Sequence, residues 1–265
     1  SNIEGDDSSF IVRAFLLTYQ LLSSTNTFCT NKEQARRSSE IRERGTLIQK
    51  PLPPNESFDL FSFPNSDITW RHYPTITTTM KVILIPGMGC TPVARSNWYA
   101  WFAKEMNKRE NVDCDLQNFP DPYKCRESIW LPHVEKLVED PEYTIVVGHS
   151  SGAACAMRLL EKTAEKPLAG CILVAAAHTD LGDEDERLSE YFNRPWDWNR
   201  MAQGASKIVL FHGTDDHLIP VKEARYIADQ LSFASHFEFR EMADKSHFFE
   251  PWSEILDVMD SIVKE

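Results

Sequence analysis

The chain lacks any run of 18 or more consecutive apolar residues, so no helix is expected to cross a membrane. It is also poor in positive charge, because 28 Lys and Arg stand against 40 Asp and Glu, giving a net charge of −12. Neither a nucleic acid nor an anionic membrane surface is therefore an expected partner. The nearest approach to a secretory signal, Phe10–Leu22, contains Arg13 and follows Glu4, Asp6 and Asp7 instead of a basic flank. We interpret it as a short amphipathic segment and predict a cytoplasmic protein.

Motifs for metals and cofactors are lacking as well. The six cysteines form no C-x-x-C pair, and no histidine cluster stands near them at the spacing of zinc ligands. There is no P-loop lysine and no G-x-G-x-x-G fingerprint. We therefore expect no metal and no cofactor. Because Cys155 and Cys171 lie inside apolar runs, reduced buried thiols are favoured, although an even number of cysteines also permits a disulfide framework.

The first 79 residues contain no methionine and little hydrophobic periodicity. They hold 10 Ser and 10 Thr, and such a composition buries too little apolar surface to offset readily the entropy lost on ordering. We predict an extension over residues 1–79, disordered or only partly ordered, followed by a folded domain over residues 80–265. All seven methionines lie at or after Met80, which suggests a natural start there with residues 1–79 translated from upstream sequence. The alternative is a genuine regulatory or targeting arm.

Beyond Met80, short apolar runs alternate with segments of helical periodicity. The pattern predicts strands over residues 81–85, 115–119, 143–147, 171–175, 207–211 and 236–241. It predicts helices over residues 97–109, 127–139, 151–163, 221–231 and 252–263. Strands that are continuous apolar runs fit a parallel sheet covered on both faces. The sequence thus predicts an α/β fold with about six parallel strands, whose site lies at the carboxyl ends of the strands.

The sequence GHSSG at residues 148–152 is a G-x-S-x-G motif between a predicted strand and a predicted apolar helix. A sharp turn from strand to helix forces the central Ser150 into a strained conformation and raises its hydroxyl above the sheet. Small residues two positions to either side allow such a turn. A glycine-containing turn with an N-cap serine is the alternative. The context favours Ser150 as a nucleophile.

A serine nucleophile needs a base, and in folds with this elbow the acid and then the histidine follow the serine along the chain. The candidates for the base are His217, His236 and His247. We prefer His247 because it lies in the loop between the last predicted strand and the last predicted helix. A surface loop histidine is the alternative.

The acid is expected after the strand predicted over residues 207–211, where two aspartates are adjacent. Both cannot face the same histidine. We choose Asp216, which would fix the imidazole tautomer and stabilise the imidazolium. Asp215 would then serve the turn, a role open to either residue, and Asp180 is a distant third candidate.

An oxyanion hole requires two backbone N–H donors. One should be the amide of Ser151, the residue after the nucleophile. The other should come from the glycine-containing loop after the first strand, where Met88 is the preferred donor.

Residues 80–265 closely resemble the retinoblastoma-binding protein 9 family of small serine hydrolases. The motifs that carry the resemblance are PGMG at 86–89, WYAWF at 98–102, PDP at 120–122, RESIWLP at 126–132, GHSSGA at 148–153, DLGDEDER at 180–187, RPWDW at 194–198, TDD at 214–216 and SHFF at 246–249. The resemblance implies an α/β-hydrolase fold and a triad of Ser150, Asp216 and His247. It also suggests that an insertion containing Trp196 and Trp198 lies over the site and lines the pocket, with ordinary aromatic packing as the alternative.

The functional hypothesis is a serine hydrolase that cleaves a small-molecule carboxylic ester or amide through an acyl-enzyme. A binding or scaffold protein on a hydrolase fold is the alternative, and a lyase that reuses the triad as a base is a third interpretation. Binding to retinoblastoma protein is associated with an L-x-C-x-E motif, which none of the six cysteines here completes. We therefore do not expect retinoblastoma protein as a partner.

Overall fold

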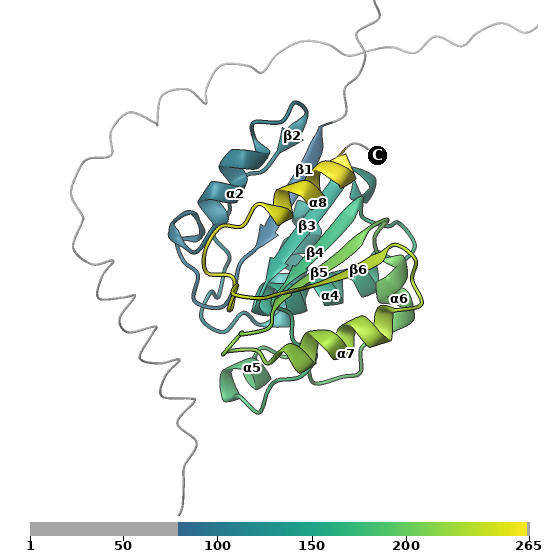
Figure 1. The fold of residues 1–265 in the computed structure, drawn as a ribbon. Helices are drawn as coiled ribbons and strands as arrows, with labels where there is room; N and C mark the ends of the chain where they lie inside the picture. Colours follow the sequence, from purple (N-terminus) through teal and green to yellow (C-terminus); the bar gives the residue numbers. More distant parts are fainter. Residues whose placement is uncertain (1–78, 264–265) are drawn as a thin grey trace, which may run out of the picture. The chain divides into compact units, whose positions relative to one another are not determined.

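The computed structural model describes residues 79–263, so the predictions for the extension before residue 79 lie outside the described residues. Within this range, six strands form one parallel sheet in the order β2-β1-β3-β4-β5-β6 (Figure 1). The strands are β1 (Met80–Ile85), β2 (Val112–Asp113), β3 (Thr144–His149), β4 (Gly170–Val174), β5 (Ile208–Gly213) and β6 (Phe237–Met242). The predicted α/β class and the predicted number of strands are confirmed.

Helices cover both faces of the sheet, as crossover connections between parallel strands require. Helices α2 and α8 pack on one face, and α3, α4, α6 and α7 contribute to the core on the other (Figure 1). The α-helices are α2 (Tyr99–Met106), α3 (Glu127–Leu137), α4 (Ser151–Lys162), α5 (Glu184–Leu188), α6 (Trp198–Gln203), α7 (Val221–Leu231) and α8 (Glu254–Val263). Two short 3₁₀ turns, η1 (Val93–Arg95) and η2 (Pro141–Tyr143), complete the elements.

Strand β1 shows how the sheet divides the core into two layers. Val82 and Leu84 join the cluster under α2 and α8, whereas Ile83 and Ile85 join the cluster under α3 and α4. Successive side chains of a strand point to opposite faces, and here both faces are apolar and buried. This explains why the strands appear in the sequence as continuous apolar runs.

The strand predicted over residues 115–119 is wrong. The second strand is the two-residue β2, which pairs with Met80 and Lys81 of β1, and residues 114–119 are irregular. The ladder stops at Cys114 because the side chain of Asn107 takes both of its backbone groups. Asn107 donates to the carbonyl of Cys114 and accepts from its N–H, each at 2.9 Å.

Helix ends also differ from the predictions. The helix predicted over 97–109 is the shorter α2, because Asn97 has a φ of 45°, outside the right-handed helical region. Helix α8 begins at Glu254, two residues later than predicted. Trp252 precedes the helix and packs its ring against Trp98 and Phe248. Its burial mimics a helical position in the sequence pattern.

The five cysteines between residues 79 and 263 are free thiols, of which four are buried and Cys90 is half-buried. This agrees with the prediction of reduced buried thiols for Cys155 and Cys171. No helix in the described range has the length and apolar character needed to span a membrane. The cytoplasmic location stays a prediction.

Candidate active site

Ser150 stands between the end of β3 and the first residue of α4. Its backbone has φ 57° and ψ −124°, a conformation that is strained for a residue with a side chain. The N–H of Ser150 donates to the carbonyl of Val174 at 2.9 Å, which ties the turn to the end of β4. The predicted strand–turn–helix context of Ser150 is therefore present.

The two glycines of the motif are required by close backbone approach. A Cβ atom at Gly148 would lie 2.5 Å from the carbonyl oxygen of Gly152. A Cβ atom at Gly152 would lie 2.3 Å from the carbonyl oxygen of Ile85 in β1. Real Cβ atoms do not tolerate such distances, so larger residues would push the elbow away from the sheet.

His247 and Asp216 are brought together although 31 positions separate them in the chain. Nδ1 of His247 lies 2.8 Å from Oδ2 of Asp216, and both side chains are almost completely buried. The other carboxylate oxygen, Oδ1, accepts the N–H groups of Leu218 and Ile219, each at 2.9 Å. The carboxylate is thus held on one side by backbone and presents its other side to the imidazole.

The electrostatics of Asp216 favour the ionised form. Burial alone would raise its pKa, but the hydrogen bond and charge of His247 and the N–H groups of Leu218 and Ile219 outweigh that effect. The pKa of Asp216 therefore lies below its ordinary value. His212 also lies nearby, but burial lowers its pKa and keeps it neutral.

Asp215 has a different task. Its Oδ1 accepts the N–H groups of Lys245 and Ser246, at 3.2 and 3.0 Å. Asp215 therefore holds the loop that carries His247, and among the described residues no hydrogen bond joins Asp215 to the imidazole.

The other two candidate bases lie elsewhere. His217 contacts the loop that carries His247, with Nδ1 3.1 Å from Oγ of Ser246. His236, by contrast, bonds to the carbonyl of Ala202, remote from this loop in sequence.

The loop after β1 reaches the nucleophile. A Cβ atom at Gly87 would lie 3.3 Å from the Cβ of Ser150, so the backbone before Met88 runs directly against the elbow. The N–H of Gly87 donates to the hydroxyl of Tyr99 at 3.0 Å, and the N–H of Gly89 donates to the carbonyl of Pro122 at 2.7 Å. Both neighbours of Met88 are anchored in this way.

Ser151 opens helix α4, so its N–H belongs to the first turn, where donors have no partner within the helix. Its side chain is buried and donates to Oε1 of Glu186 in α5 at 2.9 Å. Burial, with smaller contributions from the carboxylates of Asp183 and Asp185, raises the pKa of Glu186 to about 7, although the Ser151 hydrogen bond opposes this rise. A carboxyl group that titrates near neutral pH is thus hydrogen-bonded to Ser151, the residue that follows Ser150.

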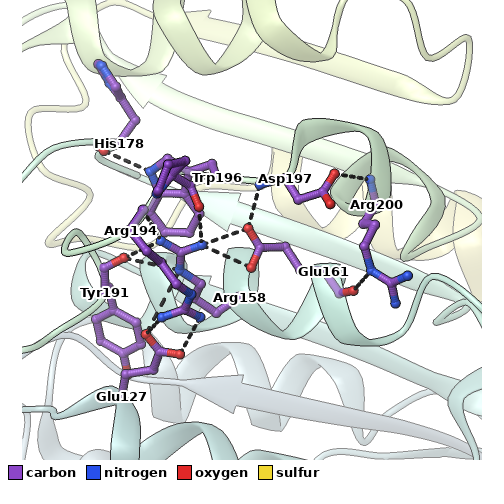
Figure 2. Close-up of polar contacts among 10 residues, drawn as sticks. Glu127, Arg158, Glu161, His178, Tyr191, Arg194, Trp196, Asp197 and Arg200 are labelled. Atoms are coloured by element: carbon purple, nitrogen blue, oxygen red, sulfur yellow. Dashed lines mark hydrogen bonds and ion pairs between the residues drawn. The ribbon is translucent and has the colours of Figure 1, made fainter.

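Trp196 and Trp198 belong to the β4–β5 insertion, which comprises residues 175–207. The indole N–H of Trp196 donates to the carbonyl of His178 at 2.9 Å, and the guanidinium of Arg158 lies 3.7 Å from the centre of its ring (Figure 2). Trp198 lies against Trp196 and Tyr226, with ring centroids 6.2 and 6.1 Å apart. These contacts make both residues part of the packing of the insertion, and pocket lining stays a prediction.

Three residues around the elbow escape prediction from sequence. They are Tyr99, His149 and Glu186, and each is joined by hydrogen bonds to residues far away in the chain. The motif WYAWF contains Tyr99, but the helical spacing within it singles out Trp98 and Trp101. Within residues 79–263, no group of three or more His, Cys, Asp or Glu side chains is arranged to hold a metal ion.

The fold first defines the class of protein. The structure is similar to the product of the ydeN gene of B. subtilis, with a TM-score of 0.61 and 23% identity, covering 71% of this chain and all of that one. It is also similar to Est1E from Butyrivibrio proteoclasticus, with a TM-score of 0.53 and 12% identity, covering 73% of this chain and 92% of that one. The chain has the α/β-hydrolase fold.

Sequence comparison then gives the family. The family model described as serine hydrolase matches residues 82–260. Serine hydrolase RBBP9 of Rattus norvegicus is 42% identical over 168 residues, which cover 63% of this chain and 87% of that protein. The chain belongs to the serine hydrolase family and is a hydrolase, and the resemblance inferred from its motifs is confirmed.

Proposed function

We propose that this protein hydrolyses a small-molecule carboxylic ester or amide through an acyl-enzyme, with Ser150 as the nucleophile. His247 is the general base and Asp216 is the acid that orients it. The observation that carries the proposal is the buried contact between Nδ1 of His247 and Oδ2 of Asp216. These residues lie on the loops that follow the carboxyl ends of β6 and β5, and the elbow follows the carboxyl end of β3 in the same parallel sheet. A histidine held in this way has its other ring nitrogen available to a serine hydroxyl.

In the proposed reaction, Oγ of Ser150 attacks the carbonyl carbon of the substrate while Nε2 of His247 takes the hydroxyl proton. The tetrahedral intermediate collapses, the bond to the leaving alcohol or amine breaks, and His247 returns the proton to that group. A water molecule then repeats the attack on the acyl-enzyme. It releases the carboxylic acid and restores the Ser150 hydroxyl.

The negative oxygen of each tetrahedral intermediate would accept the N–H groups of Ser151 and Met88. The position of Ser151 at the N-terminus of α4 supports the first donor, because helix N-termini stabilise negative charge. The anchoring of Gly87 and Gly89 supports the second donor, because it fixes the peptide plane on either side of Met88. Removing one such donor typically costs about 100- to 1,000-fold in kcat.

A fluorophosphonate probe, which labels activated serines, tests the proposal on the folded full-length protein. Wild type should be labelled and should hydrolyse a p-nitrophenyl ester, whereas Ser150→Ala should lose both without a change in thermal unfolding. Residual turnover above about a thousandth of wild type would identify another nucleophile, because loss of a triad serine usually costs more than that. Ser253→Ala is a matched control, since Ser253 precedes α8 and is exposed.

A further inference from the structure

A chain of three buried hydrogen bonds crosses the interior beneath the proposed triad. The N–H of Gly87 is 3.0 Å from Oη of Tyr99, and Oη is 2.6 Å from Nδ1 of His149. Nε2 of His149 is in turn 2.9 Å from the carbonyl oxygen of His247. Tyr99 and His149 are at most 1% exposed, so water does not compete for these bonds.

The chemistry of the partners determines which atom donates in each of these three hydrogen bonds. The carbonyl of His247 can only accept, so Nε2 of His149 carries a proton. Burial, together with the nearby His247, lowers the pKa of His149 to about 3, and its imidazole is therefore neutral with an unprotonated Nδ1. That nitrogen accepts the hydroxyl proton of Tyr99, whose oxygen accepts the N–H of Gly87. Burial raises the pKa of Tyr99 well above its ordinary value, so the hydroxyl keeps its proton.

The three hydrogen bonds connect different parts of the proposed active site. Gly87 precedes Met88 in the loop after β1, His149 precedes Ser150 in the elbow, and the last bond holds the backbone of His247. Asp216 holds the imidazole of His247 at Nδ1, and His149 holds its carbonyl. His247 is thus fixed both at its imidazole and at its backbone carbonyl. The carbonyl is connected through His149 and Tyr99 to the loop after β1.

We propose that Tyr99 and His149 are positioning residues of the hydrolytic site. They join the loop after β1, the turn at Ser150 and the loop that carries His247 into one rigid unit. This inference rests on the proposed function. Neither residue touches the reacting atoms. Their effect is to hold three loops from different elements at the spacing that the transition state requires, where small misplacements are costly.

Tyr99→Phe is the direct test, because it preserves the ring, which packs on Trp98 with centroids 5.0 Å apart. It leaves the Gly87 N–H and Nδ1 of His149 without their partner. We expect kcat for a p-nitrophenyl ester to fall about 10- to 100-fold while KM stays within about threefold, since substrate binding is unaffected. The apparent pKa on the acid side of the kcat/KM profile should be the same as in wild type, because neither Tyr99 nor His149 titrates near neutral pH.

Tyr191→Phe is the matched control. Tyr191 is also fully buried, but its hydroxyl lies near Cys155, on the opposite face of the sheet from Tyr99. This variant should keep the wild-type kcat. A second pair tests His149: Gln can still offer an N–H toward the carbonyl of His247, whereas the shorter Asn cannot, so His149→Gln should retain more kcat than His149→Asn.

The inference is overturned if Tyr99→Phe keeps kcat within about twofold of wild type, if it changes KM alone, or if Tyr191→Phe loses as much kcat. In each of these cases the wild type still hydrolyses the ester in a Ser150-dependent manner, and the proposed function stands. Absence of Ser150-dependent hydrolysis in the wild type would overturn both. A loss of kcat confined to Tyr99→Phe, with partial retention in His149→Gln, supports the inference.

Discussion

Two neighbouring aspartates with opposite orientations give the sharpest test at the scale of single residues. Asp216 faces the imidazole of His247, whereas Asp215 accepts two backbone N–H groups of the next loop. Asp216→Asn preserves the shape but removes the charge and favours the wrong tautomer of His247. We expect kcat to fall by about 10⁴-fold, the loss seen when the equivalent substitution is made in a serine protease with a Ser-His-Asp triad.

Asp215→Asn serves as the control in the same kinetic assay. The amide oxygen of Asn can still accept the N–H groups of Lys245 and Ser246, so the loss should be less than about tenfold. If Asp215→Asn were the more damaging change, the choice between the two acids would be wrong. The hydrolase function itself would be unaffected by that outcome.

Glu186 gives a pH dependence to stability. Its pKa of about 7 in the folded protein lies above its ordinary value of 4.5, so the folded state disfavours its ionised form, mainly through burial. The resulting destabilisation is absent below about pH 4.5, grows as the pH rises and is complete above about pH 7. Glu186→Gln should therefore raise the free energy of unfolding at pH 8 by roughly 1–2 kcal/mol, allowing for its partial exposure.

Urea unfolding at pH 5 and pH 8 measures this effect. The gain from Glu186→Gln should be smaller at pH 5 than at pH 8. Glu142→Gln, which changes an exposed carboxyl group, should alter the free energy of unfolding by less than about 0.5 kcal/mol at either pH. An equal gain at both pH values would mean that the carboxyl group is not responsible.

At the scale of elements, one buried arginine of α4 holds the β4–β5 insertion. Arg158 is fully buried, pairs with Glu161 at 2.8 Å and packs over Trp196 (Figure 2). Its guanidinium donates to three backbone carbonyls of the insertion, those of Tyr191, Arg194 and Pro195. Arg158→Lys keeps the charge but loses this planar fork, and should destabilise the protein by about 3 kcal/mol.

Arg200→Lys is the control for this change, and Figure 2 shows both residues. Arg200 is half-buried, pairs with the exposed Glu165 and donates to a single backbone carbonyl, that of Glu161, so its substitution should cost less than about 1 kcal/mol in denaturant unfolding. Equal losses in the two variants would show that the buried fork does not anchor the insertion.

The elements that sequence predicts well are those decided by local pattern. The apolar runs of β1, β3, β4 and β5 and the periodicity of α7 are visible within a few residues. The sequence does not predict correctly the elements that are fixed by distant or irregular contacts. Strand β2 ends where the side chain of Asn107 takes the backbone of Cys114, and α5 and α6 have only five and six residues. No periodicity can emerge over so short a length.

The residues of the proposed site divide in the same way. Ser150 is predicted from a local motif, and His247 and Asp216 are predicted from their places after predicted strands. Tyr99 and Glu186 do not, because their partners His149 and Ser151 lie 50 and 35 positions away in the chain. Contacts of that kind come from the tertiary fold and leave no spacing signal.

At the scale of the whole molecule, residues 80–263 contain every strand described and every proposed site residue. The serine hydrolase family model also lies within them, at residues 82–260. We therefore expect a Met80–Glu265 protein to unfold cooperatively and to be labelled by the fluorophosphonate probe at the wild-type rate. Thermal unfolding and labelling time courses check this, and a loss of cooperativity would show that the first 79 residues are structural.

The two edges of the sheet have a consequence for behaviour at high concentration. Unpaired strand edges can recruit a strand from another molecule and begin aggregation. Here β2 offers only two residues, and β6 carries alternating charges that form ion pairs, including Glu238 with Arg240 and Glu241 with Arg225. Adding an intermolecular strand would bring these charges against a foreign chain. Both edge strands therefore disfavour the addition of a strand from another molecule, which is the first step of such aggregation.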